Sequence, residues 1–302
     1  MSCCVLMSTY NGRKFIKEQL DSIRDQKECV DIEVFIRDDG SSDNTINLIN
    51  NYSNQCTMKI SVYQGDNRGP SGSFLELIRK APVADYYTFC DQDDVWMPGK
   101  IASAEKALAP FSSPALWISN YDVTDEKLNV IEERALIEPE KDPLKALFYN
   151  NVPGCTMVFN RSLLIELQKM NISDFRMHDI LALCVALISG KVIYDNTSYI
   201  YYRQHSSNAV GKYSKKIRPL KWVKDKFGII ISSDSFNYAT YAQRIIDAYG
   251  NILSDELKKE YTLIANYKKG INRVRLLKKE YTVGKGGRTS KSIRMRILLG
   301  KI

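Results

Sequence analysis

Hydrophobic and polar positions along the first 110 residues switch repeatedly between two periods. Short apolar or alternating runs are typical of strands, whereas apolar positions three or four residues apart indicate helices. The expected strands are 3–7, 32–37, 58–63 and 86–90, and the expected helices between them are 13–26, 45–52 and 70–80. Ser42 or Asp43 is predicted to cap the second of these helices. Strands that alternate with helices predict an α/β fold around a mostly parallel sheet.

The pattern continues less regularly beyond this part of the chain. Further strands are expected at 115–120, 156–159 and 198–202, and an apolar helix at 180–189, with a polar stretch over 122–142. Residues 235–279 have the pattern of long helices. We therefore predict one domain over 1–211, followed by a basic helical region over 212–302.

Polar turns follow three of the expected strands. They are Thr9-Tyr10, Asp38-Asp39 and Asp91-Gln92-Asp93. Because the carboxyl ends of parallel strands meet at one edge of a sheet, where ligands bind in open α/β folds, these turns are expected to converge. Such an edge can hold a nucleoside.

Each of these residues has a role that we expect and an ordinary alternative. An aspartate at the second strand end, Asp38 or Asp39, is expected to accept a hydrogen bond from a base or ribose, while Tyr10 lies beside the base. The loop with Asn67 and Arg68 is expected to meet the same ligand. The alternatives are a plain Asp-Gly turn after Asp38 and surface positions for Tyr10 and Arg68.

Three carboxylates crowd the end of the strand at 86–90. Asp91, Asp93 and Asp94 would repel one another unless a cation or hydrogen bonds offset the repulsion. Carboxylates suit Mg²⁺ or Mn²⁺, which takes its remaining ligands from substrate phosphates and water. The alternative is a solvated acidic turn before a helix that starts near Pro98.

Composition narrows the function classes. Seven irregularly spaced cysteines favour reduced thiols in the cytoplasm over a disulfide framework. Neither a signal peptide nor an apolar run of about eighteen residues is present, so no membrane span is expected. The chain also lacks the glycine motifs of dinucleotide-binding and P-loop proteins, which weakens both of those interpretations.

Taken together, the motifs resemble a known family. Residues 7–12 (MSTYNG), 37–43 (RDDGSSD) and 89–96 (FCDQDDVW) are similar to those of family 2 glycosyltransferases. The resemblance spans roughly 1–211 and is greatest to bacterial rhamnosyltransferases of surface polysaccharide synthesis. It implies the GT-A fold, a Rossmann-like nucleotide-diphospho-sugar transferase domain. It also implies inverting transfer from a nucleotide-sugar, with Asp91 and Asp93 on Mn²⁺ or Mg²⁺ and the diphosphate, and with Thr9, Tyr10 and Asp39 on the nucleoside.

The resemblance assigns roles in the second half of the domain as well. Asp179 matches the general base, which takes the proton from the acceptor hydroxyl. His178 stands where many relatives carry an acidic residue, and it is expected to bind the acceptor or to orient Asp179. Gly154 and Cys155 lie in a region that lines the acceptor pocket in the family. The alternatives are a helix cap at Asp179 and a β-turn at Gly154.

Arg203 and His205 follow the last expected strand. A guanidinium presents two donors to phosphate oxygens, so Arg203 is expected to pair with the diphosphate. His205 is a candidate additional metal ligand, as in some GT-A enzymes, with an ordinary surface loop as the alternative.

Charge divides the chain into two parts. Residues 1–210 carry 21 Lys and Arg against 28 Asp and Glu, whereas residues 211–302 carry 22 against 7. Basic residues interleave with apolar ones over 215–231 and 291–302. We expect peripheral contact with the inner face of an anionic membrane, ahead of a solvated helical domain, a partner-binding surface or nucleic-acid binding.

Two functions from different classes remain open. The first is a metal-dependent transferase that moves rhamnose from dTDP-rhamnose, or another sugar from a UDP-sugar, to a polysaccharide or lipid-linked glycan. The second is an inactive nucleotide-sugar or glycan-binding component of a polysaccharide assembly. The presence of Asp91, Asp93 and Asp179 together favours the enzyme.

Overall fold

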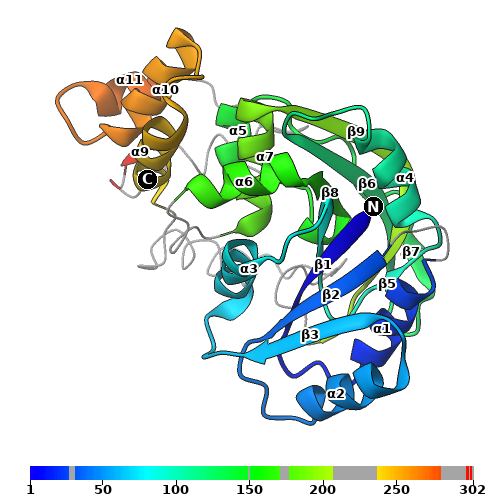
Figure 1. Cartoon of the computed structure of the whole chain (residues 1–302). Coiled ribbons are helices and arrows are strands. Elements are labelled where there is room, and N and C mark those ends of the chain that lie inside the picture. Colours follow the sequence, from blue (N-terminus) through cyan, green and yellow to red (C-terminus); the bar gives the residue numbers. More distant parts are fainter. Residues whose placement is uncertain are drawn as a thin grey trace. The chain divides into compact units, whose positions relative to one another are not determined.

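The chain forms two units in the computed structural model (Figure 1), which describes residues 1–26, 31–148, 150–170, 177–206, 237–279, 297–298 and 300. The first unit comprises Met1–Pro139 and Asn151–Lys212, and the second comprises Glu140–Asn150 and Tyr213–Ile302. The sequence-based division at residue 211 assigned Glu140–Asn150 to the first domain. In the structure this segment clusters with the second unit instead.

The N-terminal half of the first unit is a parallel sheet in the order β3-β2-β1-β4. Its elements match the expected ones closely: β1 (Ser2–Thr9), α1 (Ile16–Arg24), β2 (Asp31–Asp38), α2 (Thr45–Gln55), β3 (Lys59–Gln64), α3 (Gly69–Lys80) and β4 (Tyr86–Cys90). Asn44 is the N-cap of α2 and makes no side-chain cap bond. The Asp43 carboxylate still accepts a hydrogen bond from the Thr45 amide at 3.0 Å, so the predicted cap lies one residue too early.

Beyond β4 the sheet is mixed, and it continues in the order β8-β6-β9-β5. Strands β6 and β9 pair in parallel, whereas β8 runs antiparallel to both β4 and β6. The mostly parallel sheet expected from the sequence is thus parallel throughout from β3 to β4, and beyond β4 the parallel pair β6–β9 lies among antiparallel ones. The elements here are β5 (Val95–Trp96), α4 (Lys100–Leu108), β6 (Ala115–Thr124), β7 (Val130–Glu132), η1 (Gly154–Thr156), β8 (Met157–Asn160), α6 (Arg161–Lys169), α7 (His178–Ser189) and β9 (Lys191–Arg203).

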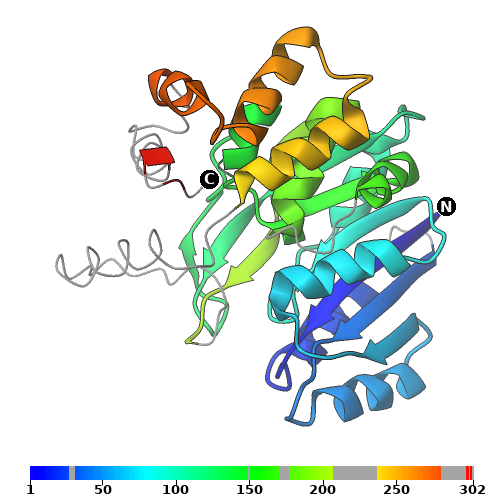
Figure 2. The ribbon, with the colours of Figure 1, turned by 90° about the vertical axis from the view of Figure 1, so that its left-hand side faces the viewer.

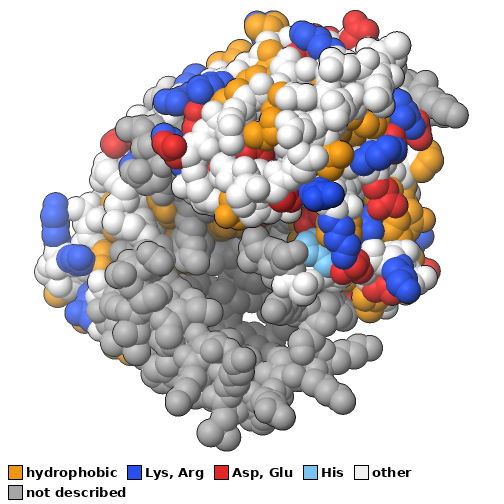
Figure 3. All heavy atoms as spheres, turned by 90° about the horizontal axis from the view of Figure 1, so that it is seen from below, with side chains coloured by type: hydrophobic (Ala, Val, Ile, Leu, Met, Phe, Trp, Pro, Cys, Tyr) orange, Lys and Arg blue, Asp and Glu red, His pale blue; other side chains and the backbone are white. Residues whose placement is uncertain are grey.

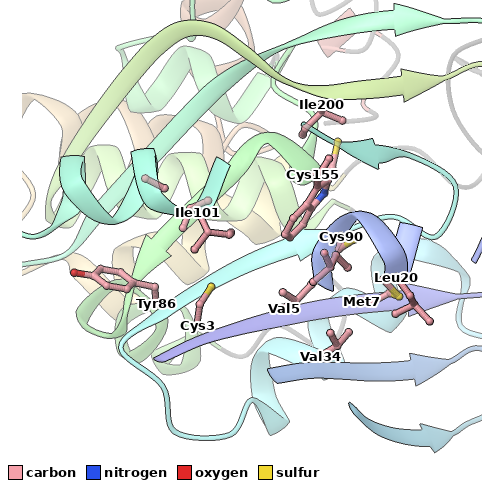
Figure 4. Packing of buried hydrophobic residues seen from close by; sticks show 14 of the residues in the cluster. Cys3, Val5, Met7, Leu20, Val34, Tyr86, Cys90, Ile101, Cys155 and Ile200 are labelled. Atoms are coloured by element: carbon pink, nitrogen blue, oxygen red, sulfur yellow. The ribbon is translucent and has the colours of Figure 1, made fainter. Parts of the chain in front are cut away.

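Helices cover both faces of this sheet. Residues of α1, α2 and α4 pack with Cys3, Val5 and Met7 of β1 in one apolar cluster, part of which is drawn in Figure 4. Helix α3, in front of the N-terminal strands in Figure 2, contacts β1, β2, α6 and α7 on the other face. Alternate residues of β1 therefore face opposite layers, and the strand is buried on both sides. The six described cysteines are free thiols, and Cys3 and Cys4 are buried.

The second unit is helical within its described residues. It contains α5 (Pro143–Phe148), α9 (Tyr238–Tyr249), α10 (Asp255–Ala265) and α11 (Asn272–Lys278). Phe148 of α5 packs on Tyr238 of α9 with ring centroids 4.8 Å apart. Among the described residues, no helix has both the length and the apolar character needed to cross a bilayer.

Candidate active site at the strand ends

The ends of β1 and β2 are joined by side-chain hydrogen bonds. Thr9 Oγ1 donates to Asp38 Oδ2 at 2.9 Å, and the Asp39 amide donates to the Thr9 carbonyl at 2.8 Å. The Asp38 carboxylate also accepts from the amide and hydroxyl of Ser41. Asp38 is fully buried. Its carboxylate holds the two turns together in this structure, so a contact between Asp38 and a nucleoside stays a prediction.

Asp39 is also buried, and it joins the second strand end to the loop after β3. One carboxylate oxygen accepts from Arg37, and it also accepts from the Arg68 amide at 2.8 Å. The side chain of Arg68 is 59% exposed, and the carboxylate of Glu76 lies 3.5 Å from it. Asn67 is exposed too. The expected ligand-facing residues of this loop are thus accessible beside Asp39.

Gln92 joins the ends of β1 and β4 through a reciprocal pair of hydrogen bonds. The Tyr10 amide donates to Gln92 Oε1 at 2.8 Å, and Gln92 Nε2 donates to the Tyr10 carbonyl at 2.9 Å. Tyr10 itself is 48% exposed. The sequence analysis gave Gln92 no role, although its place between Asp91 and Asp93 was a signal. The three strand ends therefore converge, as predicted.

Asp91, Asp94 and Cys155 form an acidic cluster just past β4. Their ligand atoms lie within 4.8 Å of one another and can hold a metal ion. Burial, followed by the charges of Asp93 and Asp179, raises the pKa of Asp91 to about 7. Burial, followed by the charges of Asp93 and Asp91, also raises the pKa of Asp94 well above its usual range. These carboxyl groups are costly to ionise together without a cation.

His205 and Asp93, two further candidate metal ligands, contact each other. His205 Nε2 is 2.7 Å from Asp93 Oδ2, and the His205 ring packs on Phe15 with centroids 4.7 Å apart. An imidazole and a carboxylate at this distance suit a shared divalent ion. The carboxylates and the imidazole therefore fit the expected Mn²⁺ or Mg²⁺. The structure adds the Cys155 thiol beside Asp91 and Asp94, a soft donor that suits these ions less well than a carboxylate.

Arg203 is almost fully buried, and protein groups surround its guanidinium. Its Nε donates to the Asp93 carbonyl at 2.8 Å, one terminal nitrogen donates to the Glu126 carbonyl at 2.6 Å, and the other contacts the Glu18 carboxylate. Its amide donates to Asp94 Oδ1 at 3.1 Å. Arg203 thus fixes the end of β9 to the Asp93-Asp94 turn, and its predicted pairing with a diphosphate stays a prediction.

Lys100 is a buried cation beneath the acidic cluster that the sequence analysis missed. Its ammonium donates to the Cys155 carbonyl at 2.8 Å and to Thr88 Oγ1 at 3.3 Å, and it lies 3.6 Å from the centroid of the Trp96 ring. Burial lowers the pKa of Lys100 to about 8, so the group is still largely charged at neutral pH. Nothing in the local sequence distinguishes it from a surface lysine at a helix start.

His178 and Asp179 begin α7, and their surroundings differ. The His178 ring stacks on Phe74 at 4.0 Å and meets the edge of Phe89 at 4.7 Å. Neither ring nitrogen has a hydrogen-bond partner within the part of the chain described here, and burial lowers the pKa of His178 to about 3. His178 is therefore neutral and held by packing. No hydrogen bond from it to Asp179 is present.

Gly154 lies against the His178 ring. A Cβ atom on Gly154 would stand 2.3 Å from His178 Nε2, closer than real contacts allow. The turn Gly154–Thr156 is thus fixed from two sides, by the His178 ring and by Lys100. The β-turn expected at Gly154 is a 3₁₀ turn in the structure, and Cys155 faces the carboxylates rather than solvent.

Figure 3 shows one face of the molecule, on which Lys, Arg, Asp, Glu and histidine side chains gather in one place.

Comparison with known proteins decides the family. The family model described as glycosyl transferase family 2 matches residues 4–167. The chain belongs to this family. The expectation of a glycosyltransferase is therefore confirmed.

Individual relatives of this family 2 glycosyltransferase are similar over different lengths. The chain is 33% identical over 238 residues to the protein named dTDP-rhamnosyl transferase RfbG of Shigella flexneri. This alignment covers 73% of the present chain and 80% of RfbG. The chain is also 32% identical over 95 residues to poly(ribitol-phosphate) beta-N-acetylglucosaminyltransferase TarS of Staphylococcus aureus. That alignment covers 31% of the present chain and 16% of TarS.

Solved structures share the fold at low sequence identity. Residues 1–349 of TarS align with 93% of this chain and 76% of that one, at a TM-score of 0.57 and 16% identity. GalNAc-T7 with UDP, GalNAc and Mn²⁺ aligns with 89% of this chain and 58% of that one, at a TM-score of 0.60 and 14% identity. The predicted fold class, a GT-A α/β domain with a helical C-terminal region, is confirmed.

Proposed function

We propose that this family 2 glycosyltransferase is a metal-dependent, inverting rhamnosyltransferase. It takes rhamnose from dTDP-rhamnose and adds it to a surface polysaccharide or a lipid-linked glycan. The observation that carries the proposal is the placement of Asp179, which begins α7, is 8% exposed and lies close enough to Asp91 to raise its pKa. A carboxylate in this position can serve as the base opposite a leaving diphosphate.

The reaction needs one proton transfer and one displacement. Asp179 accepts the proton of the acceptor hydroxyl as its oxygen attacks the anomeric carbon. The bond from that carbon to the diphosphate oxygen breaks on the opposite face, and the diphosphate leaves with the electron pair, so the configuration inverts. A divalent cation bound by Asp91, Asp93 and His205 would supply positive charge for the departing diphosphate.

The remaining candidate residues hold the two substrates in this proposal. Thr9, Tyr10 and Asp39 bind the nucleoside at the joined ends of β1 and β2, and the accessible Asn67-Arg68 loop borders them. Gly154 and Cys155 line the acceptor side. Their turn is held rigidly by Lys100, and a rigid pocket keeps the acceptor hydroxyl aligned for attack.

Support for the donor comes from the relatives. RfbG, which covers most of this chain, is named a dTDP-rhamnosyl transferase, whereas TarS has been solved with UDP-GlcNAc and with UDP. The Mn²⁺ in the GalNAc-T7 complex supports a divalent ion. The free thiols of the described cysteines favour a cytoplasmic location.

Donor binding tests the proposal without any acceptor. We expect dTDP-rhamnose with Mn²⁺ or Mg²⁺ to raise the melting temperature of the wild type, because a ligand that binds only the folded state stabilises it. Asp93→Ala or EDTA should abolish the shift, while Asp31→Ala, an exposed aspartate at the start of β2, should keep it. Stabilisation by a UDP- or GDP-sugar alone would reassign the donor, and no shift with any donor would reject the site.

Turnover then separates an enzyme from a binding protein. Asp179→Asn should keep the donor-induced shift, while transfer of the radiolabelled sugar to a cell-surface glycan extract falls by about 10²-fold or more. Normal transfer by this variant would remove Asp179 from the role of base. Donor binding without transfer by the wild type to any extract would favour the inactive binding component.

A further inference from the structure

The second unit carries a concentrated basic segment around α11. Residues 266–279 contain six Lys and Arg and no Asp or Glu. Two branched apolar residues in the same segment are unusually accessible, since Ile271 is 61% exposed and Val274 is 54% exposed. A basic segment with exposed apolar residues differs from an ordinary solvated helix, which presents polar residues to water.

The geometry of α11 places these side chains on its outer face. Successive helical residues are about 100° apart around the helix axis. Continued through the N-cap residue Ile271, this spacing puts four side chains within an arc of about 100°: Ile271, Val274, Arg275 and Lys278. Leu276 lies on the nearly opposite side and is fully buried, and α11 contacts α10. The outer face of α11 therefore has two apolar residues with cations directly beside them.

The neighbouring groove extends the positive charge. An open groove of about 740 Å³ lies between α10 and α11, and its cationic lining residues are Lys258, Lys259, Arg275, Lys278 and Lys279. Asp255 and Glu260 also line it, and Glu260 is paired with Lys279. Cations remain in excess, which suits the phosphates of lipid headgroups.

We propose that the outer face of α11 docks on an anionic lipid bilayer, with Ile271 and Val274 entering the interface and the surrounding Lys and Arg contacting headgroups. The apolar residues decide in favour of a bilayer, because a soluble polyanion would bind the cations without them. The inference goes beyond the proposed transfer reaction, since it requires neither donor nor metal.

The surface is distinct from the segments on which the sequence placed a membrane contact. Residues 215–231 lie outside the described residues, as do 291–302 apart from Ile297, Leu298 and Gly300. The proposal concerns α11 alone, so its test must separate α11 from those segments.

Co-sedimentation of the full chain with vesicles tests the proposal. One set of vesicles is phosphatidylcholine alone, and the other contains about 30% phosphatidylglycerol, which supplies the negative surface potential. We expect the wild type to bind the anionic vesicles only, and less at high salt. The double variant I271S/V274S should bind them about tenfold more weakly, because it loses the apolar contribution.

Matched controls distinguish α11 from the rest of the chain. Ile252→Ser removes an apolar residue that is 51% exposed in the same unit and should leave binding unchanged. The side chains of Ile252, Ile271 and Val274 are all exposed, so these variants should keep the wild-type melting temperature. Unchanged vesicle binding by I271S/V274S would place the contact elsewhere and overturn the proposal, as would failure of the wild type to bind. If soluble polyphosphate displaced the wild type and I271S/V274S from the vesicles equally well, the ligand would be a soluble polyanion and not a bilayer.

Discussion

At the scale of single residues, the site is organised by opposed buried charges. Asp91 and Asp94 are raised in pKa by burial and by neighbouring carboxylates, while Lys100 beneath them partly offsets this effect on Asp91. Lys100 contacts a carbonyl, a hydroxyl and an aromatic ring, and no carboxylate of the described residues forms an ion pair with it. Lys100 offsets only part of the repulsion among these carboxylates, and a divalent ion bound at the cluster would offset the rest.

The raised pKa of Asp91 predicts the pH dependence of stability in the metal-free protein. Its folded pKa of about 7 lies above the ordinary value of an aspartate, so between about pH 4 and 7 the folded state holds a proton that the unfolded state has lost. The free energy of unfolding should therefore fall as the pH rises through this window, and Asp91 should account for about 2 to 4 kcal/mol of that fall.

Urea unfolding in EDTA at pH 5 and pH 8 measures this effect. Asp91→Asn should reduce the difference between the two pH values by the contribution of Asp91, whereas Asp31→Asn, which changes an exposed aspartate, should keep it. An identical pH dependence in wild type and Asp91→Asn would mean that Asp91 is not protonated in the folded protein near pH 7.

At the scale of elements, the turn η1 and the helix α7 are fitted to each other through Gly154 and His178. The His178 ring occupies the space that a side chain at position 154 would need. Asp179 directly follows His178 in α7, so the contact between Gly154 and His178 fixes the position of the proposed base relative to the turn η1. This packing is compatible with one of the two roles expected from the sequence, the orientation of Asp179, and that role stays a prediction.

A double-mutant cycle tests this fit. Gly154→Ala should destabilise the protein by about 1 to 3 kcal/mol, as overpacking does in cores. His178→Ala removes the clashing ring, so adding it to Gly154→Ala should cost less than the sum of the two single changes by about 1 kcal/mol, the scale of direct contacts. Chemical denaturation measures the four free energies of unfolding. Additive effects would show that the two residues are not in contact.

At the scale of the whole molecule, the chain is divided in both charge and packing. The acidic part of the sequence supplies the sheet and the strand-end site, and the basic part supplies most of the second unit. The segment Glu140–Asn150 joins the second unit although it lies far from it in sequence. Phe148 shows the reason, because it is 6% exposed and packs on Tyr238.

Removing this contact should affect one unit more than the other. Phe148→Ala deletes a buried aromatic ring, a change that typically costs about 3 to 5 kcal/mol in a core. Hydrogen exchange should accelerate in residues 237–265 more than in β1–β4, because Phe148 packs on Tyr238 within the second unit. Val83→Ala, at a position that is 75% exposed in the first unit, is the control. Equal acceleration in both units would indicate one shared core.

The sequence by itself determined the alternating elements and the polar strand ends. Apolar periods reflect burial on strand and helix faces, so β1 to β4 and α1 to α3 could be predicted from local pattern. The convergence of Thr9, Asp38 and Asp91 also followed, because parallel connection places successive strand ends at one edge. The motifs at these ends were enough to indicate the glycosyltransferase family.

Only the tertiary structure decided which partners each site residue has. Lys100 has no distinctive local pattern, and the roles of Lys100 and Gln92 come from contacts with residues 55 and 82 positions away. Arg203 appeared from its chemistry to be a phosphate ligand, yet it is surrounded by protein acceptors. Hydrogen bonds and burial depend on what other segments bring into contact. Local sequence carries the periodicity of burial, and only the folded chain fixes those contacts.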